Sequence, residues 1–511
     1  MVLFVMAKPL NKARFFEAVC VAVWKLSENR LLLKRKDEDI MKQKLHAYKK
    51  TVSIVNETAI SMYEGIGRGK KGFLLESYDK NNGRYSFFGT EPEEIITSKG
   101  NSLVITCKDG SEEVREGNPL ELLKEYYSCF EVTKDDGELA MIGGFVGSLG
   151  YDFIRYSETL PDNNPDEIGI ETVQLMFPKE FITIDHVAET LTAVVLEEAN
   201  EEGRKRGEAK AAELVKLVRE NSQTGMEKQK FIHDGNIINK TDTLEEYSAK
   251  VDKIKEYIKE GHIFQTVLSQ RWTIETGHDG LTLYKELREL NPSPYLYYFQ
   301  FGNFEIIGSS PEMLVKQVDN KVFTCSIAGT RRRGKDAEED LLLKDELLQD
   351  EKERAEHVML VDLARNDMGR IAEFGTVKVT QFMEVQNYSH VMHIVSLVEG
   401  KKQGERHPLD LVASFLPAGT LSGAPKIRAM EIIDELETVK RGLYGGATGY
   451  LGFNGNMDFC ITIRTMIKKG NKVYLQAGAG IVADSVGESE YQECCNKVMA
   501  LAKTLVEEEN L

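Results

Sequence analysis

The sequence predicts an α+β fold with antiparallel sheets. Two observations support this: short alternating polar and apolar segments are joined by glycine-containing turns, and helical segments with capping signals lie between them. The chain has 511 residues, which is more than one compact core normally serves. We therefore expect either two domains or one large composite.

The first forty residues are apolar with interspersed charges. A secretory signal has a positive start and an unbroken apolar core, whereas charged residues from Lys8 to Glu17 interrupt this stretch. An amphipathic helix over 11–26 fits the pattern, and the acidic residues disfavour a transit peptide. Because Met41 offers a second start, we treat residues 1–40 as an N-terminal extension of uncertain status and assign it no function.

Residues 41–222 are predicted to form a strand-rich N-terminal region. Residues 71–90 contain two strand patterns on either side of Asn-Asn-Gly, a hairpin signature. Residues 181–197 alternate twice around another turn, and residues 200–220, rich in Glu, Lys, Ala and Leu, indicate a helix. The polar stretch 223–240 is predicted to be a linker.

Residues 241–511 are predicted to form the second domain. Thr243 and Glu246 have the spacing of a capping box, so a helix is expected to begin there and to stop at Gly261. Residues 262–272 alternate as a strand, and two more strands are expected in the apolar stretch that follows.

A long helical pattern covers residues 336–363 and contains Glu356 and His357. A charged run of this kind is usually a solvated face. Here the apolar sequence MLVDLA follows directly, which indicates that this end of the helix is buried. A buried carboxylate needs a partner such as a metal ion or an arginine, so Glu356 is a candidate ligand.

A glycine-rich stretch follows a short strand near the C-terminus. Gly478 and Gly480 bracket Ala479, and glycines let backbone N–H groups approach an anion closely. Glu490 and Glu493 lie three residues apart on one face of the next predicted helix. An anion cradle beside two carboxylates calls for a divalent cation with oxygen ligands. The structural alternative is a solvated acidic helix.

Composition and charge restrict the partners. Hydrophobic residues make up 41% and charged residues 29% of the chain, as in soluble globular proteins. The net charge of −17 argues against nucleic acid and anionic membranes, and no apolar run approaches the ~20 residues of a membrane span. The seven cysteines are scattered without C-x-x-C spacing, so we expect reduced thiols and a cytoplasmic protein.

From about Thr51 to the C-terminus, the motifs together resemble the family of anthranilate synthase large subunits, which are chorismate-binding enzymes. The matching stretches are LLES (74–77), GRYSF (83–87), NPSPY (291–295), GSSPEMLV (308–315), IAGTRRRG (327–334), ERAEHVMLVDLARND (353–367), HVMHIVS (390–396), AGTLSGAPKIRAME (418–431), YGGATGYLGFNGNMDFCITIRT (444–465) and QAGAGIVADSVGESEYQE (476–493). Each is modest evidence alone, but ten in order make chance similarity negligible. The resemblance implies an antiparallel β-sandwich core of two facing sheets flanked by helices, with an N-terminal regulatory region and a C-terminal chorismate-binding catalytic domain.

The resemblance also implies the site residues. Glu356 and Glu493 correspond to the ligands of Mg²⁺, and His393 to a catalytic general acid that protonates the hydroxyl leaving C4. Without the resemblance, a core histidine in the apolar VMHIV would be favoured. Roles for Glu312 and Lys426 stay open. The implied chorismate contacts are Gly329, Thr330, Tyr444, Arg464, Gly478, Ala479 and Gly480.

Two positions distinguish this chain from sister enzymes. Isochorismate and salicylate synthases have a lysine that acts on water where this chain has Gln265, and a neutral amide cannot act as a general base. Aminodeoxychorismate synthases often have a nucleophilic lysine where this chain has Ala328. We therefore expect ammonia addition at C2, loss of pyruvate and aromatisation to anthranilate, the first step of tryptophan biosynthesis. Aminodeoxychorismate synthase component I is the alternative, and intact site residues disfavour a catalytically silent amino-acid-binding protein.

A source of ammonia and an inhibitor are implied as well. The sequence shows no glutaminase segment, so the resemblance implies a glutamine amidotransferase small subunit (component II) as a partner. It also implies feedback inhibition by L-tryptophan, at Ser77, Pro294, Tyr295 and Leu296. Ser326 and Arg332 stand where the family usually has proline, which loosens this loop in the unfolded chain.

Overall fold

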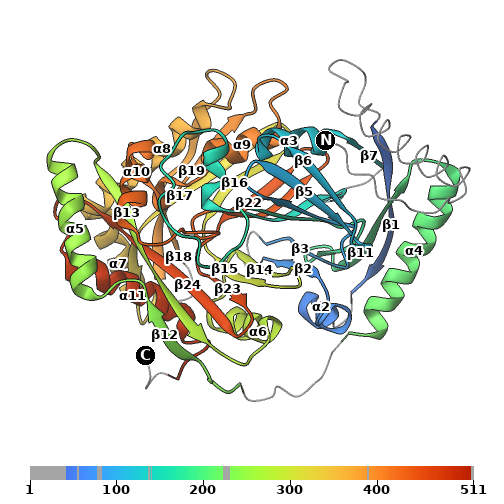
Figure 1. Ribbon diagram of the computed structural model, residues 1–511, viewed down its shortest axis with the longest axis horizontal. Coiled ribbons are helices and arrows are strands. Elements are labelled where there is room, and N and C mark those ends of the chain that lie inside the picture. Colours follow the sequence, from blue (N-terminus) through green and yellow to red (C-terminus); the bar gives the residue numbers. More distant parts are fainter. Residues whose placement is uncertain are drawn as a thin grey trace, which may run out of the picture. The chain divides into compact units, whose positions relative to one another are not determined.

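Two large antiparallel sheets form the fold in this computed structural model (Figure 1). The structure describes residues 42–54, 57–77, 83–135, 139, 141–222, 231–387 and 391–507. The extension predicted over residues 1–40 lies outside the described residues. Residues 44–511 form one compact unit. Together with the helices described below, the two sheets confirm the predicted α+β class.

The first sheet extends across the chain from one half to the other. In spatial order it contains β12 (Asn236–Lys240), β13 (Gln265–Glu275), β24 (Lys472–Ile481), β23 (Thr465–Lys469), β15 (Glu305–Ser310), β14 (Tyr295–Gln300), β2 (Gly72–Glu76), β3 (Tyr85–Thr90), β10 (Glu180–Asp185), β11 (Thr190–Glu198), β1 (Gln43–Ser53) and β7 (Phe130–Lys134), with β20 (Gly423–Ala424) beside β13.

The second sheet is built in the same way from both halves. Its order is β18 (Lys378–Asn387), β19 (Val391–Lys401), β17 (Lys321–Arg332), β16 (Met313–Val318), β22 (Met457–Ile461), β21 (Ala447–Gly452), β8 (Gly144–Leu149), β9 (Val173–Phe177), β4 (Glu94–Ser98), β5 (Ser102–Cys107) and β6 (Glu112–Glu116).

In each sheet, the strands of the region predicted as 41–222 form one block and the remaining strands form a second block beside it. The N-terminal strand β2 pairs with β14, and β8 pairs with β21, both antiparallel. The segment predicted as a linker ends in strand β12, whose main chain pairs with β13. The division of regulatory and catalytic roles between the two regions stays a prediction.

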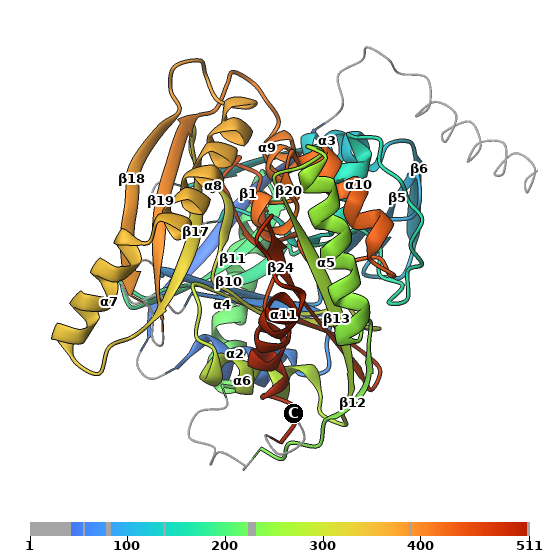
Figure 2. The ribbon, with the colours of Figure 1, turned by 90° about the vertical axis from the view of Figure 1, so that its left-hand side faces the viewer.

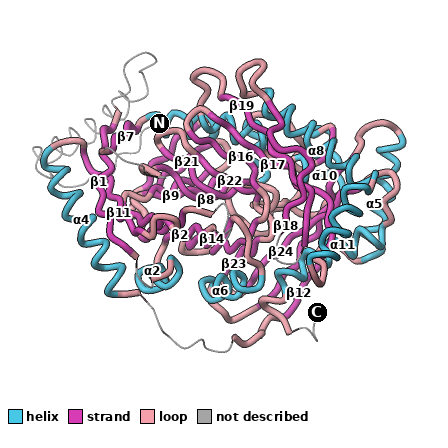
Figure 3. Tube along the Cα trace, turned by 180° about the vertical axis from the view of Figure 1, so that it is seen from behind, coloured by secondary structure: helices cyan, strands magenta, loops and turns pink. Residues whose placement is uncertain are grey.

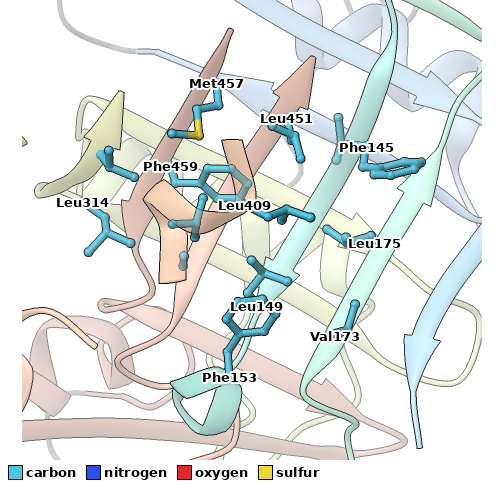
Figure 4. Packing of buried hydrophobic residues seen from close by; sticks show 14 of the residues in the cluster. Phe145, Leu149, Phe153, Val173, Leu175, Leu314, Leu409, Leu451, Met457 and Phe459 are labelled. Atoms are coloured by element: carbon cyan, nitrogen blue, oxygen red, sulfur yellow. The ribbon is translucent and has the colours of Figure 1, made fainter. Parts of the chain in front are cut away.

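Apolar side chains of the two sheets meet in one buried cluster. Phe73 and Phe299 of the first sheet belong to the same cluster as Phe145 and Phe459 of the second. Figure 4 shows side chains of this cluster on neighbouring strands of the second sheet, with Leu409 of a covering helix among them. Burial of each large apolar side chain contributes about 1.5–3 kcal/mol, so this cluster holds the sheets face to face.

Helices cover the outer faces. They are α2 (Ala59–Gly67), α3 (Pro119–Ser128), α4 (Glu201–Glu220), α5 (Leu244–Lys259), α6 (Gly280–Leu290), α7 (Ala337–Gln349), α8 (Glu351–Gly369), α9 (Pro408–Phe415), α10 (Lys426–Leu436) and α11 (Gly487–Ala502), with short 3₁₀ helices η1 (Tyr151–Tyr156) and η2 (Gly419–Leu421). Helices α2, α4, α6 and α11 share a second buried cluster with the first sheet, and α2, α4 and α6 lie outside its strands in Figure 3. No helix in the described ranges is long and apolar enough to span a membrane.

Most predicted elements are confirmed. Strands β2 and β3 pair as the expected hairpin, and β10 pairs with β11. Helix α4 covers the predicted 200–220, and α5 begins with a capping box in which the Thr243 and Glu246 side chains accept from each other's backbone N–H groups.

The single helix predicted over 336–363 is wrong. Two helices, α7 and α8, are present, and they meet at Asp350. The Asp350 side chain accepts hydrogen bonds from the N–H groups of Lys352 and Glu353. This N-cap begins a new helix and turns the chain, so Glu356 belongs to α8, which packs against β17 and β19.

Candidate active site

A β-bulge in β17 brings three predicted site residues together. The pairing with β19 shifts register between Ala328 and Thr330, and Gly329 at the bulge has a φ of +67°, which glycine adopts without steric cost. The Nδ1 atom of His393, on β19, lies 2.8 Å from the Gly329 carbonyl oxygen and 3.1 Å from the Thr330 hydroxyl.

The contact with Gly329 determines which nitrogen of His393 carries a proton. A carbonyl oxygen only accepts, so Nδ1 is the donor and the neutral ring presents Nε2 as an acceptor. Burial lowers the pKa of His393; the hydrogen bond to Gly329 opposes this, and the charge of Arg464 reinforces it. The neutral ring therefore has no proton on Nε2 to donate.

The glycine segment lies in a strand rather than in a loop. Residues Gly478, Ala479 and Gly480 pair with β13, and the strand continues to Ile481, whereas the pairing of β24 with β23 ends at Leu475. The short strand expected before the glycines is longer than predicted because β13 provides a partner along the whole length of β24. Beyond Leu475, the other edge of β24 has no strand partner in the described part of the chain, so its backbone groups can face a ligand.

Because Gly478 and Gly480 have no Cβ atom, two predicted site residues can pack directly against their backbone. A Cβ atom at Gly478 would lie 3.0 Å from the Tyr444 hydroxyl, and one at Gly480 would lie 2.5 Å from the Gln265 side-chain nitrogen. Gln265 begins β13 and is 5% exposed. The structure thus places Tyr444 and Gln265 against the same strand segment.

Arg464 completes this side of the site. Its φ is +50°, a conformation that non-glycine residues rarely adopt and that occurs at ligand sites. Burial lowers the pKa of Arg464, while Tyr444, Glu312 and Glu493 act on it in the opposite direction. The Arg464 guanidinium is therefore within electrostatic range of a predicted substrate residue, Tyr444, and a predicted metal ligand, Glu493.

The two predicted metal ligands come from helices far apart in sequence. Glu356 is on α8 and Glu493 on α11, which Figure 2 shows on the same side of the molecule. Burial raises the pKa of Glu356, and the charges of Glu353 and Glu493 raise it further. The pKa of Glu490 is raised by burial and again by Glu493. The charge of Glu493 therefore disfavours the ionised forms of both Glu356 and Glu490.

This donor set fits a divalent cation. A cation would neutralise the mutual repulsion of the carboxylates, and Mg²⁺ takes one or two protein carboxylates together with water and substrate oxygens. No group of three or more His, Cys, Asp or Glu residues in the described chain is arranged to hold a metal ion. The two-glutamate assignment of Glu356 and Glu493 stays a prediction.

Sequence reasoning missed Lys497. Its Nζ atom donates to Glu493 at 2.6 Å and to the Gly478 carbonyl oxygen at 2.9 Å. It joins the acidic helix to the glycine strand, and its i,i+4 spacing from Glu493 was the available signal.

Glu312 was left open by the sequence, and the structure gives it a distinct environment. It is 8% exposed and accepts a hydrogen bond from the Thr420 hydroxyl at 3.0 Å. Burial raises the pKa of Glu312 to about 7, although Thr420, Lys497 and Arg464 oppose the shift. A carboxyl group that is partly protonated near neutral pH can act as an acid. Lys426, by contrast, is not a solvent lysine: it forms a buried ion pair of 2.9 Å with Asp367.

The four predicted tryptophan residues line one cavity. Ser77, Pro294, Tyr295 and Leu296 lie in the wall of a cavity of about 670 Å³ between the two sheets. The Tyr295 hydroxyl donates to Asp458 at 2.9 Å, which fixes the ring as part of the wall. The wall formed by the second sheet includes Ile327 and Val395, which lie two residues from the predicted site residues Gly329 and His393.

Comparison with known proteins shows the family to which this chain belongs. Residues 73–503 match the model of the chorismate binding enzyme family. Anthranilate synthase component 1 of Acetivibrio thermocellus is 47% identical over 464 residues, which cover 88% of this chain and 93% of that protein. The chain belongs to the anthranilate synthase component 1 family. The family inferred from the ten motifs is thereby confirmed.

Solved structures agree with membership of the anthranilate synthase component 1 family. Anthranilate synthase component I from Streptococcus pneumoniae TIGR4 has a TM-score of 0.73 and 38% identity, covering 82% of this chain and 92% of that one. The menaquinone-specific isochorismate synthase MenF from Escherichia coli, at 18% identity and a TM-score of 0.65, shares the fold, with 94% of this chain and 98% of that one covered.

Proposed function

We propose that this chain is the chorismate-converting component of an anthranilate synthase. Ammonia adds at C2 of chorismate, the C4 hydroxyl leaves, and pyruvate is then eliminated to give the aromatic product anthranilate. The observation that carries the proposal is that Glu312 and Glu493 both act on Arg464, that Glu493 also acts on Glu356, and that Lys497 joins Glu493 to Gly478 of the glycine strand. This site offers one protonatable acid, one fixed cation and a carboxylate pair to a dianionic substrate.

Arg464 and Lys497 bind the substrate. The Arg464 guanidinium can hold one carboxylate bidentately, and Lys497 lies at the glycine edge where the other can approach. Mg²⁺ bound by Glu356 and Glu493 would supply positive charge for that second carboxylate. Local positive charge is needed because the chain has a net charge of −17 and repels an anion at long range.

Glu312 is the better candidate for the acid that protonates the leaving hydroxyl. His393 was expected in this role, but its Nδ1–H is engaged by Gly329 and its pKa is lowered by burial. The pKa of about 7 keeps a large fraction of Glu312 protonated at neutral pH. His393 instead holds the bulge at Gly329 and Thr330 and offers Nε2 as an acceptor.

Gln265 determines the nucleophile. A neutral amide at this buried position cannot deprotonate water, whereas ammonia is a strong enough nucleophile in its neutral form to add without a general base. Because ammonia is scarce as NH₃ at neutral pH, a glutamine amidotransferase subunit supplies it, in keeping with the name component 1 of the relatives.

The tryptophan product of the pathway would bind in the cavity beside Ser77 and Tyr295 and inhibit the reaction.

Product analysis tests the proposal. The purified chain is incubated with chorismate, Mg²⁺ and ammonium at alkaline pH, and the fluorescence of anthranilate is followed. Anthranilate together with pyruvate is expected. Aminodeoxychorismate as the product would support the alternative lyase, and no turnover in the presence of ammonia would support a binding protein without catalysis.

A further inference from the structure

A small cavity lies behind Glu312. It has a volume of about 40 Å³ and is enclosed by β16, β17, α8 and η2. Its polar lining residues are Glu312, Thr324, Ser326, Asp367 and Thr420. None of the substrate-facing residues Tyr444, Arg464 and Gly478 is among the described residues that line it, so the cavity extends from Glu312 away from the substrate.

Asp367 supplies a polar atom without a protein partner to this cavity. Its Oδ2 atom accepts from Lys426 at 2.9 Å, whereas Oδ1 is buried and has no hydrogen-bond partner among the described residues. The residue is only 4% exposed. Buried polar atoms of this kind are normally satisfied by ordered water, and 40 Å³ accommodates about three water molecules.

The chemistry requires a proton supply at this place. Under the proposed function, Glu312 gives its proton to the C4 oxygen as the C–O bond breaks, so water leaves and a buried carboxylate remains. Its hydrogen-bond partner in the described chain, the Thr420 hydroxyl, is too weak an acid to replace that proton. Each turnover therefore needs a proton from solvent before the next substrate can react.

We propose that water in this cavity returns the proton to Glu312, with Asp367 as the positioning residue that anchors the water chain. The inference rests on the proposed function of Glu312 as the acid. The half-buried Leu363 and Ala364 of α8 line the cavity, and we infer that solvent enters beside them. The proton moves from solvent through the waters to the Glu312 carboxylate. The nitrogen added at C2 releases one proton to solvent on the substrate side, so uptake and release balance over each turnover.

The charges around the path suit this role. Lys426 and Arg370 act on Asp367 and favour its ionised form, although burial raises the pKa of this carboxyl. On the substrate side, Lys497 and Arg464 act on Glu312. Cys325, which also lines the cavity, has its thiol pKa raised by burial and by Glu312, so it stays protonated and does not compete for the proton.

Two variants test the path. Ala364→Leu fills the cavity from α8, and Asp367→Asn removes the anchoring charge. In each, kcat should fall by about tenfold, KM for chorismate should stay unchanged, and the solvent isotope effect on kcat should increase. Imidazole buffer near pH 7 should restore kcat in a saturable manner by protonating Glu312 from the open substrate side. Ala355→Leu and Asp362→Asn, on the exposed face of α8, are the controls.

The outcomes separate this inference from the proposed function. If the wild-type chain makes anthranilate and Ala364→Leu retains the wild-type kcat and isotope effect, the water path is wrong. A loss that imidazole does not restore also overturns it, because that result indicates damage to the fold. If Asp367→Asn does not fold, Ala364→Leu alone decides. Absence of anthranilate in the wild type would instead overturn the proposed function.

Discussion

The guanidinium of Arg441 lies over the ring of Tyr444, 5.6 Å from its centroid, and 4.7 Å from that of Tyr151. Arg441 and Glu437 form an ion pair in which both side chains are buried. The Glu437 carboxylate accepts from Arg441 at 2.6 Å and from the Ser269 hydroxyl at 2.7 Å. Arg441 further donates to the backbone carbonyls of Leu421 and Val267. This network fixes Tyr444 beside the glycine strand.

Replacement of Arg441 by methionine should therefore affect both stability and substrate binding. The change leaves the Glu437 carboxylate buried without its partner, which should lower the free energy of unfolding by about 3–5 kcal/mol. KM for chorismate should rise because Tyr444 loses its support. Urea unfolding and steady-state kinetics measure the two effects. Arg428→Met, at a half-exposed position on α10, should change neither; an unchanged KM in Arg441→Met would contradict the positioning role.

Glu493→Gln tests the metal assignment. Loss of the carboxylate should reduce Mg²⁺-dependent turnover by about a hundredfold, since charge stabilisation by a metal ion contributes several kcal/mol, and the circular dichroism spectrum should not change. Glu488→Gln, an exposed residue in the first turn of the same helix, is the matched control. Normal rates and Mg²⁺ affinity in Glu493→Gln would remove this residue from the metal site.

The pKa of Glu312 predicts a pH profile for catalysis. Under the proposed function the protonated form is the active one, so kcat, expressed per free ammonia, should decrease as the pH rises through about 7. Glu312→Gln should lose about 10²–10⁴-fold in kcat. Stopped measurements of anthranilate across pH 5.5–9, an interval of about two units on each side of that pKa, determine the profile. A profile that does not fall above neutrality would return the acid role to another residue.

The same residue makes a prediction for stability. Because the pKa in the folded state (about 7) exceeds the ordinary value of 4.5, the folded chain binds more protons than the unfolded chain between these pH values. The contribution of Glu312 to stability is complete below pH 4.5 and is lost as the pH rises through 7. Glu312→Gln should therefore be more stable than the wild type at pH 8, by on the order of 3 kcal/mol, in thermal unfolding. Equal stability at pH 8 would contradict the raised pKa.

Ser77→Leu should relieve inhibition by tryptophan while activity is retained. The larger side chain enters the 670 Å³ cavity and removes a hydroxyl that can bond the amino acid. The inhibitor concentration for half inhibition should rise about tenfold or more, a change of about 1.4 kcal/mol. Ser53→Leu, at an exposed strand end, serves as control. Unchanged inhibition in Ser77→Leu would place the inhibitor elsewhere.

Gln265→Lys should alter the nucleophile. A lysine in this buried position would have a lowered pKa and could deprotonate water, so hydroxylated products should appear beside anthranilate on chromatography. Phe264→Lys, at the neighbouring exposed residue, should leave the products unchanged. Anthranilate as the sole product of Gln265→Lys would mean that position 265 does not select the nucleophile.

The elements that the sequence predicted well are those with local signals. The hairpin of β2 and β3, the helix α4 and the capping box of Thr243 depend on residues a few positions apart, and periodicity and turn chemistry determine them. The break at Asp350 has a local signal too, an N-cap aspartate inside a continuous helical pattern. The pattern concealed it because both helices have charged residues on their exposed faces.

The candidate site likewise has features that depend on local sequence and features that depend on residues distant in sequence. The sequence by itself determined the family, the neutral Gln265 and the two acidic helices, because these depend on residue identity and order. Only the tertiary structure decided that Gly478–Gly480 lies in a strand paired along one edge among the described residues, that Lys497 joins that segment to Glu493, and that burial raises the pKa of Glu312. Strand pairing, desolvation and the acceptor opposite a ring nitrogen arise from residues distant in sequence, so no local pattern contains them.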